Sequence, residues 1–160
     1  MHSQMTKLDS NLFMTTVMLP TINVKLLNED AKIPTKAHDS DAGWDLYAAE
    51  DMKIPNGMRK TIKTGVSIAI PDGYSGLIWP RSGLSVKFGV DVLAGVVDAG
   101  YRGEIMVCLL NTDHSSWVQI KKGDRIAQIL FQEVPKFKLY QVAELDDTER
   151  AEGGFGSSGK

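Results

Sequence analysis

Apolar and polar residues alternate along most of the chain in short runs, and glycine or proline ends nearly every run. The segment Thr61–Ile70 is the clearest example, because its side chains separate into two faces with a period of two, as in a β-strand. The inward face would carry Ile62, Thr64, Val66, Ile68 and Ile70, and the outward face Lys63 and Ser67. The strand would end at the turn sequence Pro71-Asp72-Gly73.

Similar runs predict more strands, and few segments have a helical period. The further strands are expected at Ile22–Leu27, Gly76–Trp79, Gly89–Val97, Glu104–Asn111, Trp117–Ile120, Arg125–Phe131 and Leu139–Ala143. The best helical candidate is short, Ser82–Lys87, directly after Pro80 and Arg81. Many short strands at close spacing favour an all-β sandwich or barrel over alternating strands and helices.

The chain has 160 residues and a mass of 17.6 kDa, enough for one domain with a substantial core. We expect a loose N-terminal extension over 1–20, a β-barrel domain over 21–143, and a connector with a glycine-rich arm over 144–160. The arm reads RAEGGFGSSGK, and so many glycines disfavour a strand there. Plain terminal disorder is the usual fate of such a composition.

The formal net charge of −2 gives no basic field that would attract nucleic acid, so an anionic ligand needs a local cluster of cations. A single cysteine, Cys108, excludes an intrachain disulfide and fits a reducing compartment such as the cytoplasm, of a cell or of a virus's host. The thiol lies in an apolar run and is expected to be buried and inert. No apolar run is long enough to span a membrane, and no secretory signal is recognisable.

Two segments could bind a ligand, the first a phosphate group and the second a planar ligand edge. In PRSGLS, Arg81, Ser82 and Gly83 precede or begin the expected helix, where backbone N–H groups favour phosphate. A helix N-cap at Ser82 beside a surface arginine explains the same residues equally well. In GVVDAGYRGEI, a β-hairpin would present the Asp98 carboxylate and the Tyr101 phenol at its mouth. An aspartate at that place is more often a turn former than a base.

Two further polar residues lie within strand-like runs. Asp45 in SDAGWDLYAAE alternates with Trp44 and Leu46, and an edge strand with its carboxylate in solvent is the simplest interpretation. Gln128 in GDRIAQILF shares a face with apolar neighbours and needs a hydrogen-bond partner if it is buried. The three histidines have no metal-ligand spacing with one another or with Cys108.

Five segments in this order resemble the five motifs of the homotrimeric dUTPase family. They are DAGWDL, PRSGLS, GVVDAGYRG, GDRIAQILF and RAEGGFGSSG, and the resemblance covers the chain from about Ile22 onward. It implies an all-β trimer of the β-clip, distorted jelly-roll kind with a flexible C-terminal arm. It also implies hydrolysis of dUTP to dUMP and pyrophosphate by water attack on the α-phosphorus, with Mg²⁺ as cofactor. This activity limits uracil in DNA and supplies dUMP for thymidylate synthesis. Active sites of the family lie between subunits, and the arm of one subunit closes a site formed by others.

The resemblance also implies a role for each matching residue. Asp98 would activate the water, Tyr101 would pack under the deoxyribose, and Asp45 would contact Mg²⁺ through water. The other substrate-binding positions are Arg81, Ser82 and Gly83 at the phosphates, Val92, Gly95, Val96, Val97 and Met106 at the nucleoside, Gln128 near the phosphates, and Arg150, Phe155, Gly156, Ser157 and Ser158 in the arm. Gly100, Val92 and Trp44 depart from the common family pattern.

Two other functions remain possible at this level. A dCTP deaminase, or a bifunctional deaminase and dUTPase, shares the implied fold, but that family has a catalytic glutamate eight residues after the turn glycine. Counting from Gly100, this chain has Cys108, which disfavours deamination. A regulatory or structural β trimer that binds nucleotide is the second alternative.

Overall fold

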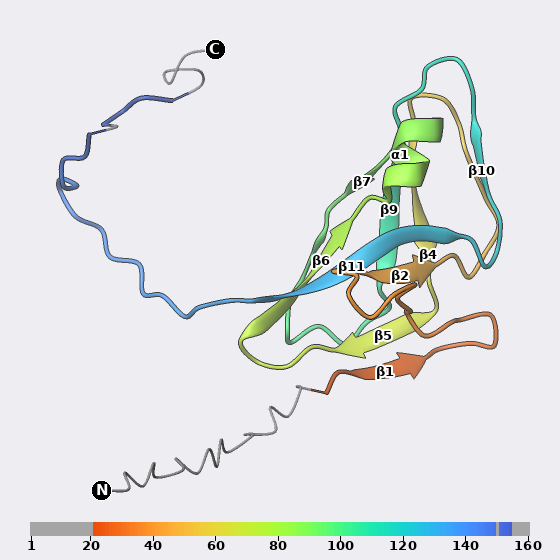
Figure 1. Cartoon of the computed structure of the whole chain (residues 1–160), viewed down its shortest axis with the longest axis horizontal. Helices are drawn as coiled ribbons and strands as arrows, with labels where there is room; N and C mark the ends of the chain where they lie inside the picture. The colour runs from red at the N-terminus through yellow and green to blue at the C-terminus, as the bar shows by residue number, and fades with distance from the viewer. Residues whose placement is uncertain (1–20, 150, 155–160) are drawn as a thin grey trace, which may run out of the picture.

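The structure is a computed structural model and describes residues 21–149 and 151–154. This part of the chain contains eleven short strands and one short helix (Figure 1). The strands are β1 (Asn23–Leu26), β2 (Trp44–Tyr47), β3 (Met52–Ile54), β4 (Arg59–Lys63), β5 (Val66–Ala69), β6 (Tyr74–Trp79), β7 (Val90–Leu93), β8 (Val96–Val97), β9 (Met106–Asn111), β10 (Val118–Ile120) and β11 (Arg125–Glu133), and the helix is α1 (Ser82–Phe88). The predicted all-β class with one short helix is confirmed.

The strands form four small antiparallel sheets around one core. Two sheets are larger, β2-β11-β6-β8 and β4-β9-β7, and the pairs β1-β5 and β10-β3 complete the body. The core consists almost entirely of isoleucine, valine, leucine and alanine side chains, among which Leu46, Ile62 and Ile129 are fully buried. Burial of each such side chain stabilises the fold by about 1.5–3 kcal/mol. The sheets therefore provide a rigid support for the turns between them.

The predicted strand Thr61–Ile70 is two strands, β4 and β5. They separate at Thr64 and Gly65, where Gly65 has a positive φ of +69° that suits a residue without a side chain. After this turn the chain changes partner, because β4 pairs with β9 whereas β5 pairs with β1. Ser67, expected on the outer face, is instead buried, and its hydroxyl donates to the backbone oxygen of Arg102 at 2.7 Å.

The predicted strand Gly89–Val97 is also divided, into β7 and β8, by the turn at Ala94 and Gly95. The prediction that β8 continues through a hairpin into the next strand is wrong. Asp98 does begin a tight turn, in which the N–H of Tyr101 donates to the oxygen of Asp98 at 3.0 Å. However, β8 pairs with β6, whereas the next strand, β9, pairs with β4 and β7. The turn after Asp98 therefore carries the chain from one sheet to another.

The strand predicted at Leu139–Ala143 is wrong as well, since no strand is present there. After β11 the described chain leaves the body as an extended segment (Figure 1). Its apolar side chains are exposed, with Phe137 at 81% and Leu139 at 96%. The alternating pattern is real, but a strand needs a neighbouring strand that supplies its hydrogen bonds.

Within the described ranges, no helix is long and apolar enough to cross a membrane.

Candidate active site

The structure places most of the described candidate residues in two cavities. The first has a volume of about 280 Å³, and its walls include Asp45, Arg81, Ser82, Gly83 and Gln128. The second has a volume of about 390 Å³, and its walls include Val96, Val97, Asp98, Tyr101 and Met106. No described residue lines both cavities. We name the first the cationic cavity and the second the carboxylate cavity.

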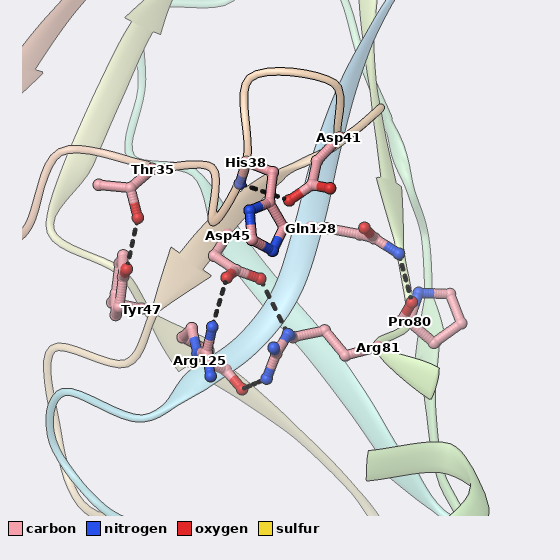
Figure 2. A network of polar contacts seen from close by, with 9 residues as sticks. All are labelled: Thr35, His38, Asp41, Asp45, Tyr47, Pro80, Arg81, Arg125 and Gln128. Carbon is pink, nitrogen blue, oxygen red and sulfur yellow. Dashed lines mark hydrogen bonds and ion pairs between the residues drawn. The ribbon is translucent and has the colours of Figure 1, made fainter. Parts of the chain in front are cut away.

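The cationic cavity is organised by the carboxylate of Asp45 on β2 (Figure 2). One oxygen, Oδ1, accepts a hydrogen bond from Nε of Arg81, with an N–O distance of 2.8 Å. The other, Oδ2, accepts one from Nη1 of Arg125, with an N–O distance of 3.2 Å. The Asp45 side chain is only 14% exposed, although β2 is an edge strand. The interpretation of a carboxylate in solvent is therefore wrong, because both arginines cover it.

This network fixes the guanidinium of Arg81. Its Nε is held by Asp45, and its Nη1 donates to the backbone oxygen of Arg125 at 3.3 Å. The remaining N–H groups of this planar fork are left for a ligand, and such forks suit phosphate oxygens. The orientation is thus set before any ligand arrives, which reduces the entropy cost of binding.

Ser82 and Gly83 are the first residues of α1, where N–H groups have no intrahelical acceptor. Arg81, in an extended conformation, occupies the N-cap position without a side-chain capping bond. The alternative of a Ser82 N-cap is therefore wrong. The helix ends at Gly89, whose φ of +62° closes it in the left-handed region.

Gln128 has the partner that its position demanded. It lies on β11, and its Nε2 donates to the backbone oxygen of Pro80 at 3.0 Å (Figure 2). Its Oε1 lies so close to Gly43 that a Cβ at residue 43 would be 2.6 Å away. A side chain at residue 43 would therefore displace the Gln128 amide from its contact with Pro80.

The carboxylate cavity lies beside the turn after β8. Asp98 is exposed at the start of this turn, and Tyr101, 43% exposed, closes it. The Arg102 side chain holds the turn from within, since its Nη1 donates to the backbone oxygens of Ala99 at 2.6 Å and Tyr101 at 2.8 Å. A carboxylate at a stiffened turn and a phenol three residues later thus face the same cavity.

Three further residues of the nucleoside region have distinct positions. Gly95 accepts the N–H of Ile78 at 2.7 Å, and a Cβ at Gly95 would be 2.6 Å from the backbone oxygen of Ile78. The absence of a side chain there therefore serves the packing of β8 on β6. Val92 lies outside the carboxylate cavity and lines a neighbouring one of about 380 Å³ with Gly95 and Val96. Cys108, expected to be buried, is half-buried and lines the carboxylate cavity.

Arg150, Phe155, Gly156, Ser157 and Ser158 lie outside the described residues. Sequence reasoning missed four other positions at the site, Arg125, Gly43, Gly103 and Glu104. Alternation alone would not have found Arg125, because it places this residue on the strand face opposite Gln128. The strand register shifts between Arg125 and Ala127, and the Arg125 side chain reaches Asp45. The two glycines and the glutamate act through close approach and loop contacts that carry no periodic signal.

The residues present suit a metal ion only as part of a ligand. Within the described ranges, no group of three or more histidine, cysteine or acidic side chains could hold a metal. Both Asp45 oxygens already accept arginine N–H groups, but a carboxylate has further lone pairs for a water molecule. The cationic cavity is lined by two arginines and by two aspartates, Asp41 and Asp45, so its formal charges balance.

Comparisons with known proteins identify the family of this chain. The sequence profile of the dUTPase family matches residues 29–159. A deoxyuridine 5'-triphosphate nucleotidohydrolase of Mycolicibacterium gilvum is 48% identical over 149 residues, covering 89% of this chain and 97% of that protein.

Two solved structures have the same fold. A dUTPase variant of Staphylococcus bacteriophage 80alpha with dUpNHpp has a TM-score of 0.84 and 32% identity, covering 89% of this chain and all of that one. A dUTPase variant of phage phi11 of S. aureus, described with a structural Mg(II) ion, has a TM-score of 0.74 and 30% identity, covering 80% of this chain and all of that one. The family match, the identity and the shared fold agree, and the chain belongs to the dUTPase family.

Proposed function

We propose that this protein hydrolyses dUTP to dUMP and pyrophosphate through attack of water on the α-phosphorus. The observation that carries the proposal is the pre-oriented Arg81 fork at the wall of the cationic cavity, held by Asp45 at 2.8 Å. A triphosphate is the kind of ligand that such a fork binds. The activity would keep uracil out of DNA and supply dUMP, in the cytoplasm where deoxynucleotides are used.

Asp98 is the proposed general base. It is an exposed carboxylate at a turn stiffened by Arg102, so it can reach a water molecule without rearrangement of the chain. A general base contributes about 10²–10⁴-fold to such a reaction when it lies within hydrogen-bond reach of the water. Tyr101 would lie under the deoxyribose, where its ring leaves no room for a 2′-hydroxyl.

The cationic cavity would hold the phosphates. Arg81, the N–H groups of Ser82 and Gly83, and Gln128 supply hydrogen-bond donors there. The charges of the cavity walls already balance, whereas a triphosphate carries up to four negative charges. Further cations are therefore required, and Arg150 of the C-terminal arm is a suitable one. An arginine supplied by a mobile segment contributes about 10³–10⁵-fold in analogous phosphoryl transfer.

Mg²⁺ would enter as part of the substrate, bound to the phosphate oxygens, where it neutralises charge and orients the chain of phosphates. Asp45 would contact it through water. The protein's own contribution is to hold Asp45 in place with Arg81 and Arg125.

Backbone groups between Val92 and Val97 would select the base. Uracil presents an N3–H donor and an O4 acceptor, whereas cytosine presents the reverse at both positions. Fixed backbone groups that satisfy uracil would leave buried groups unpaired against cytosine, at a cost of about 1–3 kcal/mol each.

The complete site would form between subunits of a homotrimer. Separate cavities in one chain can serve one reaction if a neighbouring subunit brings the carboxylate cavity next to the cationic one. The segment after β11 supports such an assembly, because Phe137, Leu139 and Leu145 are more than 80% exposed and need apolar cover. The arm that follows would then close a site on a neighbouring subunit with Arg150 and Phe155.

A nucleotide panel tests the proposal. We expect pyrophosphate release from dUTP with Mg²⁺, little from UTP, dCTP or dTTP, and no ammonia from dCTP. Ammonia release would instead establish a deaminase, against the argument from Cys108. Binding of dUTP without any product would establish a nucleotide-binding regulatory or structural trimer.

A further inference from the structure

The loop that carries Tyr101 has a second support, on the side away from Asp98. We infer that Glu104 is a positioning residue that holds the Tyr101 ring and so sets the discrimination between deoxyribose and ribose nucleotides. This inference rests on the proposed function, because it assigns Tyr101 to the sugar of the nucleotide. Glu104 is half-buried and lines the carboxylate cavity.

Tyr101 is held at three points, one through its backbone and two through its side chain. Its backbone N–H donates to Asp98 within the turn at 3.0 Å. Its hydroxyl donates to the backbone oxygen of Glu104 at 3.1 Å. Its ring lies against Gly103 so closely that a Cβ at residue 103 would collide with the ring and the hydroxyl. The position of the ring therefore depends on where the backbone of Gly103 and Glu104 lies.

The Glu104 carboxylate fixes that backbone to the turn between β4 and β5. Its Oε1 accepts the N–H of Gly65 at 2.8 Å. Gly65 is buried in the left-handed conformation, and a Cβ there would be 2.6 Å from the Cβ of Ala31. This turn is therefore tightly packed and cannot follow the loop if the contact is lost.

Adjacent contacts join the same two segments. The N–H of Ile105 donates to the oxygen of Val66 at 2.8 Å, and the hydroxyl of Thr64 donates to the oxygen of Ile105. These contacts hold the loop at its C-terminal end. Among the hydrogen bonds of the described residues, Glu104 alone makes both connections. Its carboxylate accepts the N–H of Gly65, and its backbone oxygen accepts the hydroxyl of Tyr101.

Loss of the Glu104 carboxylate leaves a buried N–H of Gly65 without its acceptor, which favours movement of the loop. A ring that is no longer held from Glu104 can swing and admit a 2′-hydroxyl. The rate constant kcat/KM for UTP should then rise relative to that for dUTP. Since one hydrogen bond is involved, the ratio of the two should fall about tenfold.

The test compares kcat/KM for dUTP and UTP in four variants. Glu104→Ala is expected to lower the dUTP to UTP ratio about tenfold. Glu104→Gln retains an acceptor oxygen and is expected to retain most of the ratio. Tyr101→Phe removes the hydroxyl that donates to Glu104 and is expected to lower the ratio to a similar extent. The double variant combines Glu104→Ala with Tyr101→Phe. Because both changes release the same ring, its dUTP to UTP ratio should fall little further than in either single variant.

Glu50→Ala is the matched control. The Glu50 carboxylate also accepts a backbone N–H, that of Lys63 at 3.0 Å, two residues before Gly65. Among the described residues, the Glu50 side chain has no hydrogen bond to the Tyr101 loop, so its loss tests general loosening of the same region. The ratio should stay at its wild-type value in Glu50→Ala.

Each outcome decides the matter. A wild-type ratio in Glu104→Ala, or an equal fall in Glu50→Ala, would overturn the inference and leave the dUTPase proposal intact. If Glu104→Ala does not fold, a wild-type ratio in Tyr101→Phe overturns it. A wild-type protein that does not hydrolyse dUTP would refute the proposed function, and this inference with it.

Discussion

At the scale of single residues, the proposed chemistry depends on Asp98. Asp98→Asn preserves the size of the side chain but removes its ability to take a proton from water. We expect kcat for dUTP to fall by about 10²–10⁴-fold while the dissociation constant of a non-hydrolysable dUTP analogue changes little. Stopped-flow or steady-state proton release measures the first quantity and calorimetry the second. Full turnover by this variant would show that another group is the base.

A substitution of Asp45 is expected to act indirectly, because this residue orients Arg81 rather than contacting the reacting atoms. Asp45→Ala removes the acceptor that holds the guanidinium and leaves Arg81 and Arg125 without the carboxylate that both of them contact. Misplacement of a phosphate-binding group by about 1 Å can cost 10²-fold, so kcat/KM for dUTP should fall by about that factor. Asp30→Asn is the control, since it breaks the exposed pair with Lys122 at 2.8 Å. Such a surface pair contributes about 0–1 kcal/mol to stability. Equal effects of both changes would argue against the orienting role.

At the scale of elements, the junction of β6 and β8 has a strict steric limit. Gly95→Ala would place a Cβ 2.6 Å from the backbone oxygen of Ile78, and neither backbone segment can yield cheaply. We expect a loss of about 1–3 kcal/mol in the free energy of unfolding, together with weaker nucleotide binding. Gly100→Ala is the matched control, because a Cβ there meets no atom within 4 Å. Denaturant titration of both variants measures the difference, and similar midpoints would contradict this account of the glycine.

The C-terminal arm is the second element with a clear expectation. A protein that ends after Asp147 lacks Arg150 and Phe155 but keeps the whole sheet structure. We expect it to fold and assemble normally and to lose about 10³–10⁵-fold in kcat, as in enzymes that lose a mobile arginine. Size-exclusion chromatography and pyrophosphate release measure the two properties. Normal hydrolysis by the truncated protein would exclude the arm from catalysis.

At the scale of the whole molecule, the two cavities predict complementation between inactive subunits. Arg81→Ala damages the cationic cavity and Asp98→Asn the carboxylate cavity, so each variant alone should be nearly inactive. If a site takes one cavity from each of two subunits, random mixing restores an intact pair in about a quarter of the sites. Unfolding and refolding the mixture, followed by an activity assay, tests this. If activity does not reappear, each chain holds its own complete site or the subunits do not exchange.

Much of the fold could be predicted because its signals are local. Alternation located the strands around Ile62, Ile78 and Ile129, and Pro80 marked the start of the short helix expected at Ser82–Lys87. The errors lie where pairing is not local. Alternation continues through Thr64 and Gly65 although the strand partner changes there, and it is present at Leu139–Ala143, where the described chain offers no partner.

The kinds of chemistry available to this protein follow from its amino-acid sequence alone. Arginine, glycine and serine after a strand suit phosphate, Asp98 and Tyr101 fall in one short loop, and five ordered motifs identify the family, because side-chain chemistry and spacing are properties of the chain alone. Which of these groups come into contact depends on the folded arrangement of the chain. It placed both arginines on Asp45, tied Tyr101 through Glu104 to Gly65, and separated the cationic cavity from the carboxylate cavity. Such contacts join residues far apart in sequence, and their geometry depends on the packing of four sheets that no local pattern encodes.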